Sequence, residues 1–361
     1  MSQKRALVTG PTGFIGINLI KALLSSGHQV TAMVRATSDT SALEKLGVRL
    51  VEADLGDFNS LLPAVADQQV IYHLAAVARA VDVSEFAKVN LDGFENLMQA
   101  AIAEGQDPKL VFVSTLAAMG PSANTRPHRE DDTAAPISNY GRSKRAAELL
   151  TRQYCQRLNI SIARPPIVLG PHDTKGLAIF QTIDRFSTHF NPSANNAVYS
   201  VIHVSDLCRA LLAIAARGRR VSPDQLSSGI YFTAADALVT YKELGALVSQ
   251  SLGKRFTLHL PVFSPILRLI GGINTLAGKL SGSPKFLNYD KVRDATAGSW
   301  SCENLKLKKE TGVEFSIPFA TRIAQTVNWY RNEGWLTDAS SQHQSPTTAP
   351  IGNATSQLRR S

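Results

Sequence analysis

The sequence predicts an α/β protein with a doubly wound parallel sheet and a smaller, mainly helical C-terminal region. Short β-branched runs alternate with helical patterns through the first 170 residues, and a glycine-rich turn follows the first run. After Gly170 the alternation becomes irregular. Regular alternation at this spacing is typical of a parallel sheet with helices on both faces.

The length and composition fit a globular chain. The 361 residues are 44% hydrophobic and 19% charged, enough for one large α/β domain or two linked ones. No run of eighteen apolar residues suggests a membrane span. Three widely separated cysteines, Cys155, Cys208 and Cys302, indicate neither a metal site nor a disulfide framework, so we expect a reducing compartment, the cytoplasm.

The net charge of +9 is carried by the C-terminal part. Residues 1–150 hold 14 Lys+Arg and 16 Asp+Glu, a net of −2, whereas residues 151–361 hold 24 and 13, a net of +11. The basic residues are scattered and lack the interleaved aromatic side chains of a nucleic-acid surface, so we expect no nucleic-acid partner. A solvated basic surface and attraction of an anionic ligand or membrane remain open.

Six strands are expected in the first part, each separated from the next by a helix. The expected strands are RALVTG (5–10), QVTAMVR (29–35), VRLVEADL (48–55), QVIYHLAA (69–76), KLVFVST (109–115) and ISIARPPIVLG (160–170). The helical patterns cover 15–27, 40–47, 58–67 and 90–105, and a further one opens at Tyr140.

Beyond Gly170 we expect fewer strands and more helices. Residues 170–186 suggest a loop and a helix, 197–218 a strand and a helix, and 228–236 a strand. In the helix at 240–253, Thr240 and Glu243 have the spacing of a capping box. Residues 316–336 form an amphipathic pattern, and 337–361, poor in large apolar groups, should be a disordered tail.

The segment VTGPTGFIG places Gly10, Gly13 and Gly16 between the first strand and the first helix. Such glycines allow a tight turn and let backbone N–H groups approach a pyrophosphate. The strand before the turn and the helix after it support a dinucleotide-binding, Rossmann-type unit. The residues expected at this turn are Gly10, Thr12, Gly13, Phe14, Ile15 and Gly16.

The end of the second strand should read the adenosine ribose. An acidic residue there favours NAD, and a cation accommodates the 2′-phosphate of NADP. Arg35 follows the strand directly, and Asp39 comes later. NADP(H) is therefore favoured, with NAD(H) open if Arg35 is only a solvated loop residue.

Eight motifs in register now make the sequence resemble an extended short-chain dehydrogenase/reductase of the NAD-dependent epimerase/dehydratase family. They span roughly residues 5–336: TGPTGFIG, ADL, HLAA, VNLDG, VSTLAAMG, YGRSK, ARPPIVLGP and IHVSDL. The chain looks most like 3β-hydroxysteroid dehydrogenase-like and dihydroflavonol reductase-like members. The resemblance implies further cofactor contacts from Asp54 and Leu55 beside adenine, Leu74, Ala75 and Ala76 along the groove, and Pro165 and Ile167 near the nicotinamide.

The same resemblance makes Tyr140, Lys144 and Thr115 the catalytic set. Spacing of four places Tyr140 and Lys144 on one helix face. Tyr140 would exchange a proton with the substrate oxygen, while the Lys144 ammonium lowers the phenol pKa and bonds the nicotinamide ribose. Thr115 would orient the reacting oxygen. Asn90 either supports a proton-relay water or joins two elements.

The substrate is less defined by the sequence. Relatives that act on nucleotide sugars usually carry an arginine four residues before the His of the IHV segment, where this chain has Tyr199. Residues 260–280 are largely apolar and have three readings: a buried helix, a pocket wall or lid, or a peripheral membrane-surface helix.

We therefore expect an NADP(H)-dependent oxidoreductase that interconverts a secondary alcohol and a ketone on a small apolar, steroid-, terpenoid- or flavonoid-like substrate. The alternatives are a nucleotide-sugar epimerase or dehydratase that retains NAD, and a non-catalytic dinucleotide-binding regulator. The expected domains are a Rossmann domain of residues 1–170 plus about 200–236, and a substrate-binding region of about 171–199 and 237–336. No metal is expected, and the resemblance implies a homodimer through the helices near Asn90 and Tyr140.

Overall fold

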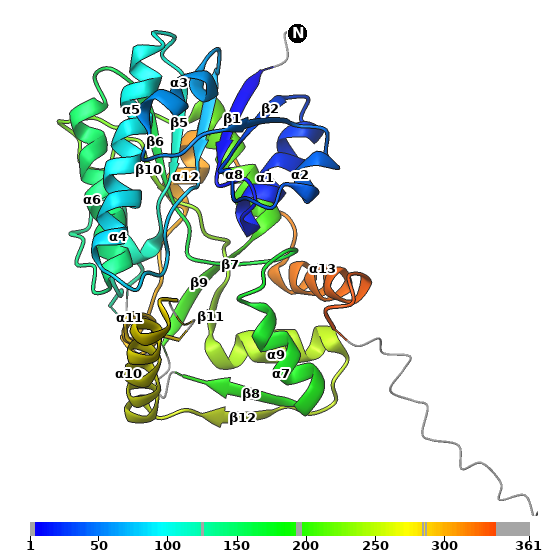
Figure 1. Cartoon of the computed structure of the whole chain (residues 1–361). Helices are drawn as coiled ribbons and strands as arrows, with labels where there is room; N and C mark the ends of the chain where they lie inside the picture. Colours follow the sequence, from blue (N-terminus) through cyan, green and yellow to red (C-terminus); the bar gives the residue numbers. More distant parts are fainter. Residues whose placement is uncertain (1–3, 124–125, 193–196, 284, 286, 337–361) are drawn as a thin grey trace, which may run out of the picture.

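A seven-stranded parallel sheet forms the larger part of the structure, a computed structural model that describes residues 4–123, 126–192, 197–283, 285 and 287–336 (Figure 1). The strand order is β10-β6-β5-β4-β1-β2-β3. The chain builds outward from β1 to β3, then crosses to β4 on the other side, so the order reverses between β1 and β4. Ligands of such sheets bind at this reversal, beyond the carboxyl ends of the strands. The strands are β1 (Arg5–Thr9), β2 (Gln29–Val34), β3 (Arg49–Glu52), β4 (Val70–His73), β5 (Lys109–Val113), β6 (Asn159–Arg164) and β10 (Ile230–Phe232).

Helices bury both faces of this sheet. Ala6 and Val8 of β1 point into one apolar cluster with α1 and α8, while Leu7 points into a second cluster with α3, α5 and α6. Successive strand residues alternate between faces, which is why the strands read as continuous apolar runs. The helices are α1 (Phe14–Ser25), α2 (Ser41–Glu44), α3 (Phe58–Val65), α4 (Ser84–Ala87), α5 (Gly93–Ala103), α6 (Asn139–Tyr154), α8 (Val204–Arg217) and α12 (Leu305–Thr311), with a π turn η1 (Lys88–Asp92) and a 3-10 turn η2 (Leu116–Ala118).

The C-terminal region packs below the carboxyl ends of the large sheet (Figure 1). It contains a three-stranded sheet, β11-β9-β7, and a parallel pair, β12-β8. Its elements are β7 (Ile167–Leu169), α7 (Leu177–Phe186), β8 (Thr188–Asn191), β9 (Val198–His203), β11 (Leu238–Thr240), α9 (Tyr241–Leu252), β12 (Leu258–Pro261), α10 (Ser264–Ser281), α11 (Tyr289–Ala295) and α13 (Phe319–Asn332). The predicted fold class, including the mainly helical C-terminal region, is confirmed.

One local prediction is wrong, and one of the three readings of residues 260–280 is excluded. The run at 160–170 is not one strand, because β6 ends at Arg164 and β7 starts at Ile167 in a different sheet. Pro165 and Pro166 have no N–H to continue the ladder. Helix α10 is not a buried helix, since Leu269, Ile273 and Leu280 are 65%, 58% and 82% exposed. No helix among the described residues is long and apolar enough to cross a membrane.

The capping box at 240–253 is present, with Thr240 and Glu243 bonded reciprocally. The three cysteines are buried free thiols. The domain division stays a prediction, and the tail expected at 337–361 lies outside the described residues.

Candidate active site

A cavity of about 280 Å³ opens at the carboxyl ends of four central strands. Its walls come from the turn after β1, from the segments after β4, β5 and β6, and from α6. The predicted residues in this lining are Gly10, Gly13, Phe14, Ile15, Gly16, Leu74, Ala76, Thr115, Tyr140, Lys144 and Pro165. The fold therefore brings most of the predicted site together at the point where the strand order reverses.

The glycine turn is packed so tightly that side chains are excluded. A Cβ at Gly16 would lie 2.2 Å from the carbonyl oxygen of Gly10, and Gly10 itself has φ +66 and would place a Cβ 2.9 Å from the Ala75 nitrogen. Only glycine adopts these positions without moving the backbone. The first turn of α1 thus opens toward the cavity with its N–H groups, a geometry suited to a pyrophosphate.

A second set of bonds joins this turn to the segment after β4. The Thr9 hydroxyl accepts hydrogen bonds from the backbone nitrogens of Leu74 and Ala75 at 3.2 and 3.1 Å. The same hydroxyl lies 2.9 Å from Nδ1 of buried His73. These contacts explain why the HLAA segment borders the groove.

Tyr140 is held against the turn that follows β5. Helix α6 begins with Ser138, whose hydroxyl accepts from the Gly141 nitrogen at 3.1 Å. A Cβ at Gly141 would come within 2.3 Å of the Ala117 carbonyl oxygen, so the glycine permits close approach of α6 to η2. This packing brings the Thr115 hydroxyl near the Tyr140 side chain, close enough to affect its titration.

Burial dominates the titration of Tyr140 and Lys144. It raises the pKa of Tyr140 to about 12, against the opposing effect of the Thr115 hydrogen bond, and the Asp294 charge raises this pKa further. Burial lowers the pKa of Lys144 to about 7, partly offset by the Glu148 carboxylate. The Lys144 ammonium also lies 4.1 Å from the centre of the Phe112 ring. At neutral pH Tyr140 is therefore a phenol, able to donate a proton.

Glu148, which was not predicted from the sequence, links helix α6 to the ends of β5 and β6. It is one turn beyond Lys144 on α6 and accepts from Ser114 Oγ at 2.6 Å. Arg164 donates to both of its carboxylate oxygens, at 2.9 and 2.8 Å, and Arg145 donates at 3.0 Å. Ser114 precedes Thr115 and Arg164 precedes Pro165, so this network positions α6 and the ends of β5 and β6 relative to one another.

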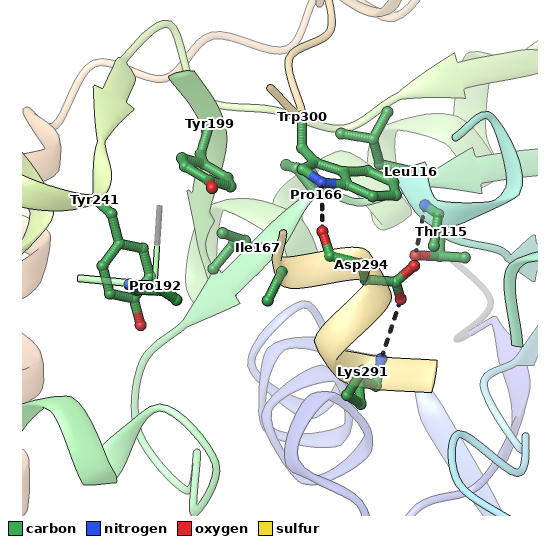
Figure 2. A pocket seen from close by; sticks show the side chains of 12 residues that line it. Thr115, Leu116, Pro166, Ile167, Pro192, Tyr199, Tyr241, Lys291, Asp294 and Trp300 are labelled. Atoms are coloured by element: carbon green, nitrogen blue, oxygen red, sulfur yellow. Dashed lines mark hydrogen bonds and ion pairs between the residues drawn. The ribbon is translucent and has the colours of Figure 1, made fainter. Parts of the chain in front are cut away.

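An apolar pocket of about 310 Å³ adjoins the cavity beside the glycine turn, and Thr115 and Pro166 line both. Figure 2 shows Tyr199, Tyr241 and Trp300 on one side and α11 on the other. The remaining lining residues are Leu116, Ala117, Ile167, Pro192, Lys291, Asp294 and Ala295. Ile167, predicted near the nicotinamide, thus lines this pocket.

The two charged residues of the pocket come from α11. The Lys291 ammonium lies 5.1 Å from the centre of the Tyr140 ring. Oδ1 of Asp294 is buried and has no hydrogen-bond partner within the described chain. Burial raises the pKa of Asp294 despite nearby Lys291. No motif marked either residue, since α11 follows a segment without recognisable pattern.

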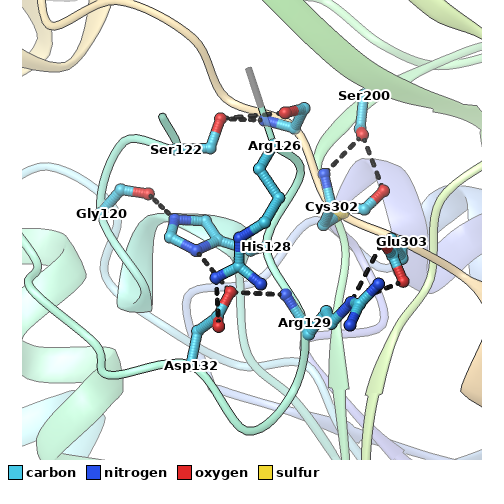
Figure 3. Close-up of polar contacts among 10 residues, drawn as sticks. Gly120, Ser122, Arg126, His128, Arg129, Asp132, Ser200, Cys302 and Glu303 are labelled. Atoms are coloured by element: carbon cyan, nitrogen blue, oxygen red, sulfur yellow. Dashed lines mark hydrogen bonds and ion pairs between the residues drawn. The ribbon is translucent and has the colours of Figure 1, made fainter. Parts of the chain in front are cut away.

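The segment that carries Trp300 is joined by hydrogen bonds and an ion pair to the loop before α6, and Figure 3 shows the pair of Arg129 with Glu303. Ser122 and His128 donate backbone hydrogen bonds to Ser299 and Ser301 at 2.8 and 2.9 Å. Arg129 pairs with Glu303 at 3.2 Å. Residues 120–123 and 126–132 together with the segment 299–303 therefore form one support for the Trp300 ring.

Other predicted residues lie outside the shared lining. Thr12 lines a separate cavity together with Asp39, and Arg35 is exposed beyond the end of β2. The Asp54 carboxylate accepts from Gly56 N at 2.7 Å, and Leu55 is 7% exposed in the core. Lys175, which was not predicted, also lines the cavity beside the glycine turn.

Asn90 joins two elements. Its side chain bonds both the nitrogen and the oxygen of Val77, at 2.8 and 2.9 Å, and donates to Ser143 Oγ at 2.9 Å. These bonds link the segment after β4 to α6, one of the two alternatives left open by the sequence.

Comparison with known proteins gives a consistent set of matches. The model of the NAD dependent epimerase/dehydratase family matches residues 6–228. A ceramide reductase of Caulobacter vibrioides is 28% identical, with 91% of this chain and 95% of the relative covered. Sterol demethylase protein B of Methylococcus capsulatus is also 28% identical, with 91% and 99% covered. The crystal structure of a dTDP-glucose 4,6-dehydratase from Streptomyces venezuelae with NAD has a TM-score of 0.73 at 24% identity, covering 92% and 98%.

Proposed function

Because the chain belongs to the NAD dependent epimerase/dehydratase family, we propose that it is an NADP(H)-dependent oxidoreductase acting on a secondary alcohol or ketone of an apolar, lipid-like molecule. One observation carries the proposal. Thr115 lies where the glycine-turn cavity meets an apolar pocket, within hydrogen-bonding reach of Tyr140. A carbonyl carbon at this junction would be next to both the hydride carrier and the proton donor.

The residues present fit a dinucleotide. The tight glycine turn leaves no room for a Cβ at Gly16, so backbone N–H groups and the N-terminus of α1 face the cavity. Lys175 adds a cation to its lining. When bound, the nicotinamide supplies or accepts the hydride.

The chain's own residues would handle the proton. Tyr140, with its pKa raised to about 12, donates its phenolic proton to the carbonyl oxygen during reduction. The Thr115 hydroxyl orients the same oxygen, and a charged Lys144 one turn away favours the resulting phenolate. Oxidation runs these steps in reverse and needs the phenolate from the start.

The pocket supports an apolar substrate. Tyr199, at the place where nucleotide-sugar relatives usually carry an arginine, is 6% exposed and its ring forms part of the wall. The other large rings, Tyr241 and Trp300, are likewise suited to apolar contact. Two relatives of similar length are named for ceramide and sterol chemistry, and we propose the same class here.

NADP(H) preference is proposed from the end of β2. Asp39 Oδ1 accepts from both the nitrogen and the hydroxyl of Ser41, at 3.0 and 2.7 Å, so its carboxylate is already engaged by the first residue of α2. The exposed Arg35 guanidinium has no carboxylate partner in the described part of the chain. Arg35→Ala should weaken NADPH affinity about tenfold or more and leave NADH affinity unchanged. Arg49→Ala is the matched control, because Arg49 is the first residue of β3 and so lies at the opposite edge of the sheet from Arg35.

We also propose a homodimer through α5 and α6, and the cytoplasm as the compartment. Both helices cover the same face of the large sheet (Figure 1). The absence of disulfides among the described cysteines agrees with a reducing compartment. Sedimentation of the purified chain measures the first, and imaging of a tagged chain in cells measures the second.

The activity test uses purified protein, NADPH and two probe ketones, a keto sterol and an oxidised ceramide. We expect ketone-dependent loss of reduced nicotinamide absorbance. Tyr140→Phe should lower kcat by about 10²–10⁴-fold with NADPH affinity unchanged. Tyr154→Phe, on the same helix but outside the cavity, serves as control.

Two results would overturn the proposal. Turnover of UDP-glucose or dTDP-glucose without net change in reduced cofactor would make the chain an epimerase or dehydratase. Cofactor binding without turnover of any probe, and a cellular role untouched by Tyr140→Phe, would favour a dinucleotide-binding regulator.

A further inference from the structure

Helix α10 turns its apolar side away from the protein. Its inner side packs on α11, where a Cβ at Gly271 would lie 2.7 Å from Val292 Cγ2. Thr275 Oγ1 accepts from the Tyr289 nitrogen at 2.9 Å, and Asn274 donates to the Leu287 oxygen at 3.0 Å. Besides Leu267, which is 8% exposed, the inner side thus meets the fold mainly through small and polar groups.

The outer side of α10 carries large apolar residues at helical spacing. Ile266, Leu269, Ile270, Ile273, Leu276 and Leu280 are 51%, 65%, 38%, 58%, 61% and 82% exposed. In a surface helix of a globular protein this stripe normally faces the core. In Figure 1 α10 lies at the edge of the molecule, with α11 at its upper end.

Further exposed apolar residues lie in β12 and beside it, in the segment that leads into α10. Phe256, Leu258, Leu260 and Phe263 are 68%, 45%, 37% and 61% exposed. With the α10 stripe they form one continuous stretch of chain, which we call the apolar face (exposed apolar residues of 256–280). An apolar surface of this extent marks an interaction site.

The charged residues near the apolar face favour an anionic partner. Residues 244–289 contain no Asp or Glu, and their charged residues are all basic: Lys254, Arg255, Arg268, Lys279 and Lys285. Lys254 pairs with Asp184 at 3.1 Å, whereas the other four are exposed. A second copy of the chain would bring like charges together, while an anionic surface would be attracted.

From these observations we propose that the apolar face docks on an anionic phospholipid bilayer, with α10 lying in the plane of the interface. Apolar side chains on one side of a helix flanked by cations are the features of interfacial helices. Helix α11, on which α10 packs, carries Lys291 and Asp294 of the apolar pocket. In the docked enzyme, α10 would lie on the membrane and α11, which lines the pocket, would lie directly behind it.

The test is flotation of the full chain with vesicles. Wild type should bind phosphatidylcholine vesicles that contain phosphatidylserine, and bind less at high salt or without phosphatidylserine. Leu269→Glu/Ile273→Glu should reduce bound protein about tenfold or more, because two apolar anchors become anionic. Leu305→Glu is the matched control, since Leu305 is also 65% exposed but lies on α12.

Cofactor affinity and circular dichroism of each variant check that it is folded. The proposal is overturned if wild type fails to bind the anionic vesicles, or if the double variant binds as well as Leu305→Glu. It is also overturned if wild type self-associates without binding vesicles and the double variant is monomeric, because the apolar face would then join two copies. Vesicle binding is measured without turnover, so its outcome is independent of the proposed reaction.

Discussion

Substitution of Glu148 by Gln should cost most of the stability carried by one buried ion pair. Glu148 and Arg164 are 2% and 1% exposed, and Arg164 donates two hydrogen bonds to the carboxylate at 2.9 and 2.8 Å. The amide side chain of the variant would keep the volume but lose the charge. Nη1 of Arg164 already has no partner in the described chain, so the guanidinium would be left buried and largely uncompensated.

The expected loss follows from the geometry. Breaking a buried pair by removing one partner costs about 3–5 kcal/mol, and the amide carbonyl can still accept one bond, so we expect about 3 kcal/mol. Burial raises the pKa of Glu148, but Arg164 and the hydrogen bonds outweigh it and leave the pKa lowered. A depressed carboxylate pKa contributes stability that is present above the unfolded value, near 4.3, and lost as pH falls through the folded value.

The assay is urea unfolding of wild type, Glu148→Gln, Arg164→Met and the double variant at pH 7. The double variant should recover much of the loss, because it leaves neither charge buried alone. Glu52→Gln, at an exposed position of β3, should change stability by less than about 0.5 kcal/mol. A loss below about 1 kcal/mol for Glu148→Gln, or a double variant no more stable than the less stable single variant, would refute the reasoning.

Three further outcomes are expected. Gly16→Ala should weaken NADPH binding about 10–100-fold, because its Cβ would lie 2.2 Å from a carbonyl oxygen of the turn. Gly272→Ala is the control, since a Cβ there would have no neighbouring atom within 4 Å. Equal NADPH titration curves for the two variants would contradict this prediction. The rate of alcohol oxidation should rise with pH, since the reaction needs the phenolate of Tyr140. Asp294→Asn should move this rise to lower pH, because the Asp294 charge adds to burial in raising the Tyr140 pKa. A pH profile of kcat/KM that does not move would contradict this prediction. Lys144→Met should abolish turnover yet stabilise the cofactor-free protein at pH 6, by at most about 5 kcal/mol for a pKa lowered from 10.5 to about 7. The buried ammonium lowers the free energy of unfolding below pH 7 and has no effect above pH 10.5. A gain in stability that persists undiminished at high pH would therefore disprove this cause.

Local patterns in the chain were sufficient to predict the sheet, the glycine turn and the Tyr140–Lys144 helix. Gly10, Gly13 and Gly16 form their turn within seven residues, and the Tyr–Lys spacing follows from the helical repeat. Interactions at such short separations are encoded by residue type and order alone. The two prolines Pro165 and Pro166 were equally evident in the sequence, but the change of sheet that follows from them was not predicted.

Tertiary structure decided what these local elements face. Glu148 meets Arg164 from another element, and Asp294 reaches the pocket 179 residues after Thr115, separations at which no periodicity operates. The apolar composition of 260–280 left three readings open, a buried helix, a pocket wall or lid, and a membrane-surface helix, because the same residues suit a core or an interface. Only the packing of Gly271 and Thr275 on α11 turned it outward, because a helix buries whichever side its neighbours can approach closely.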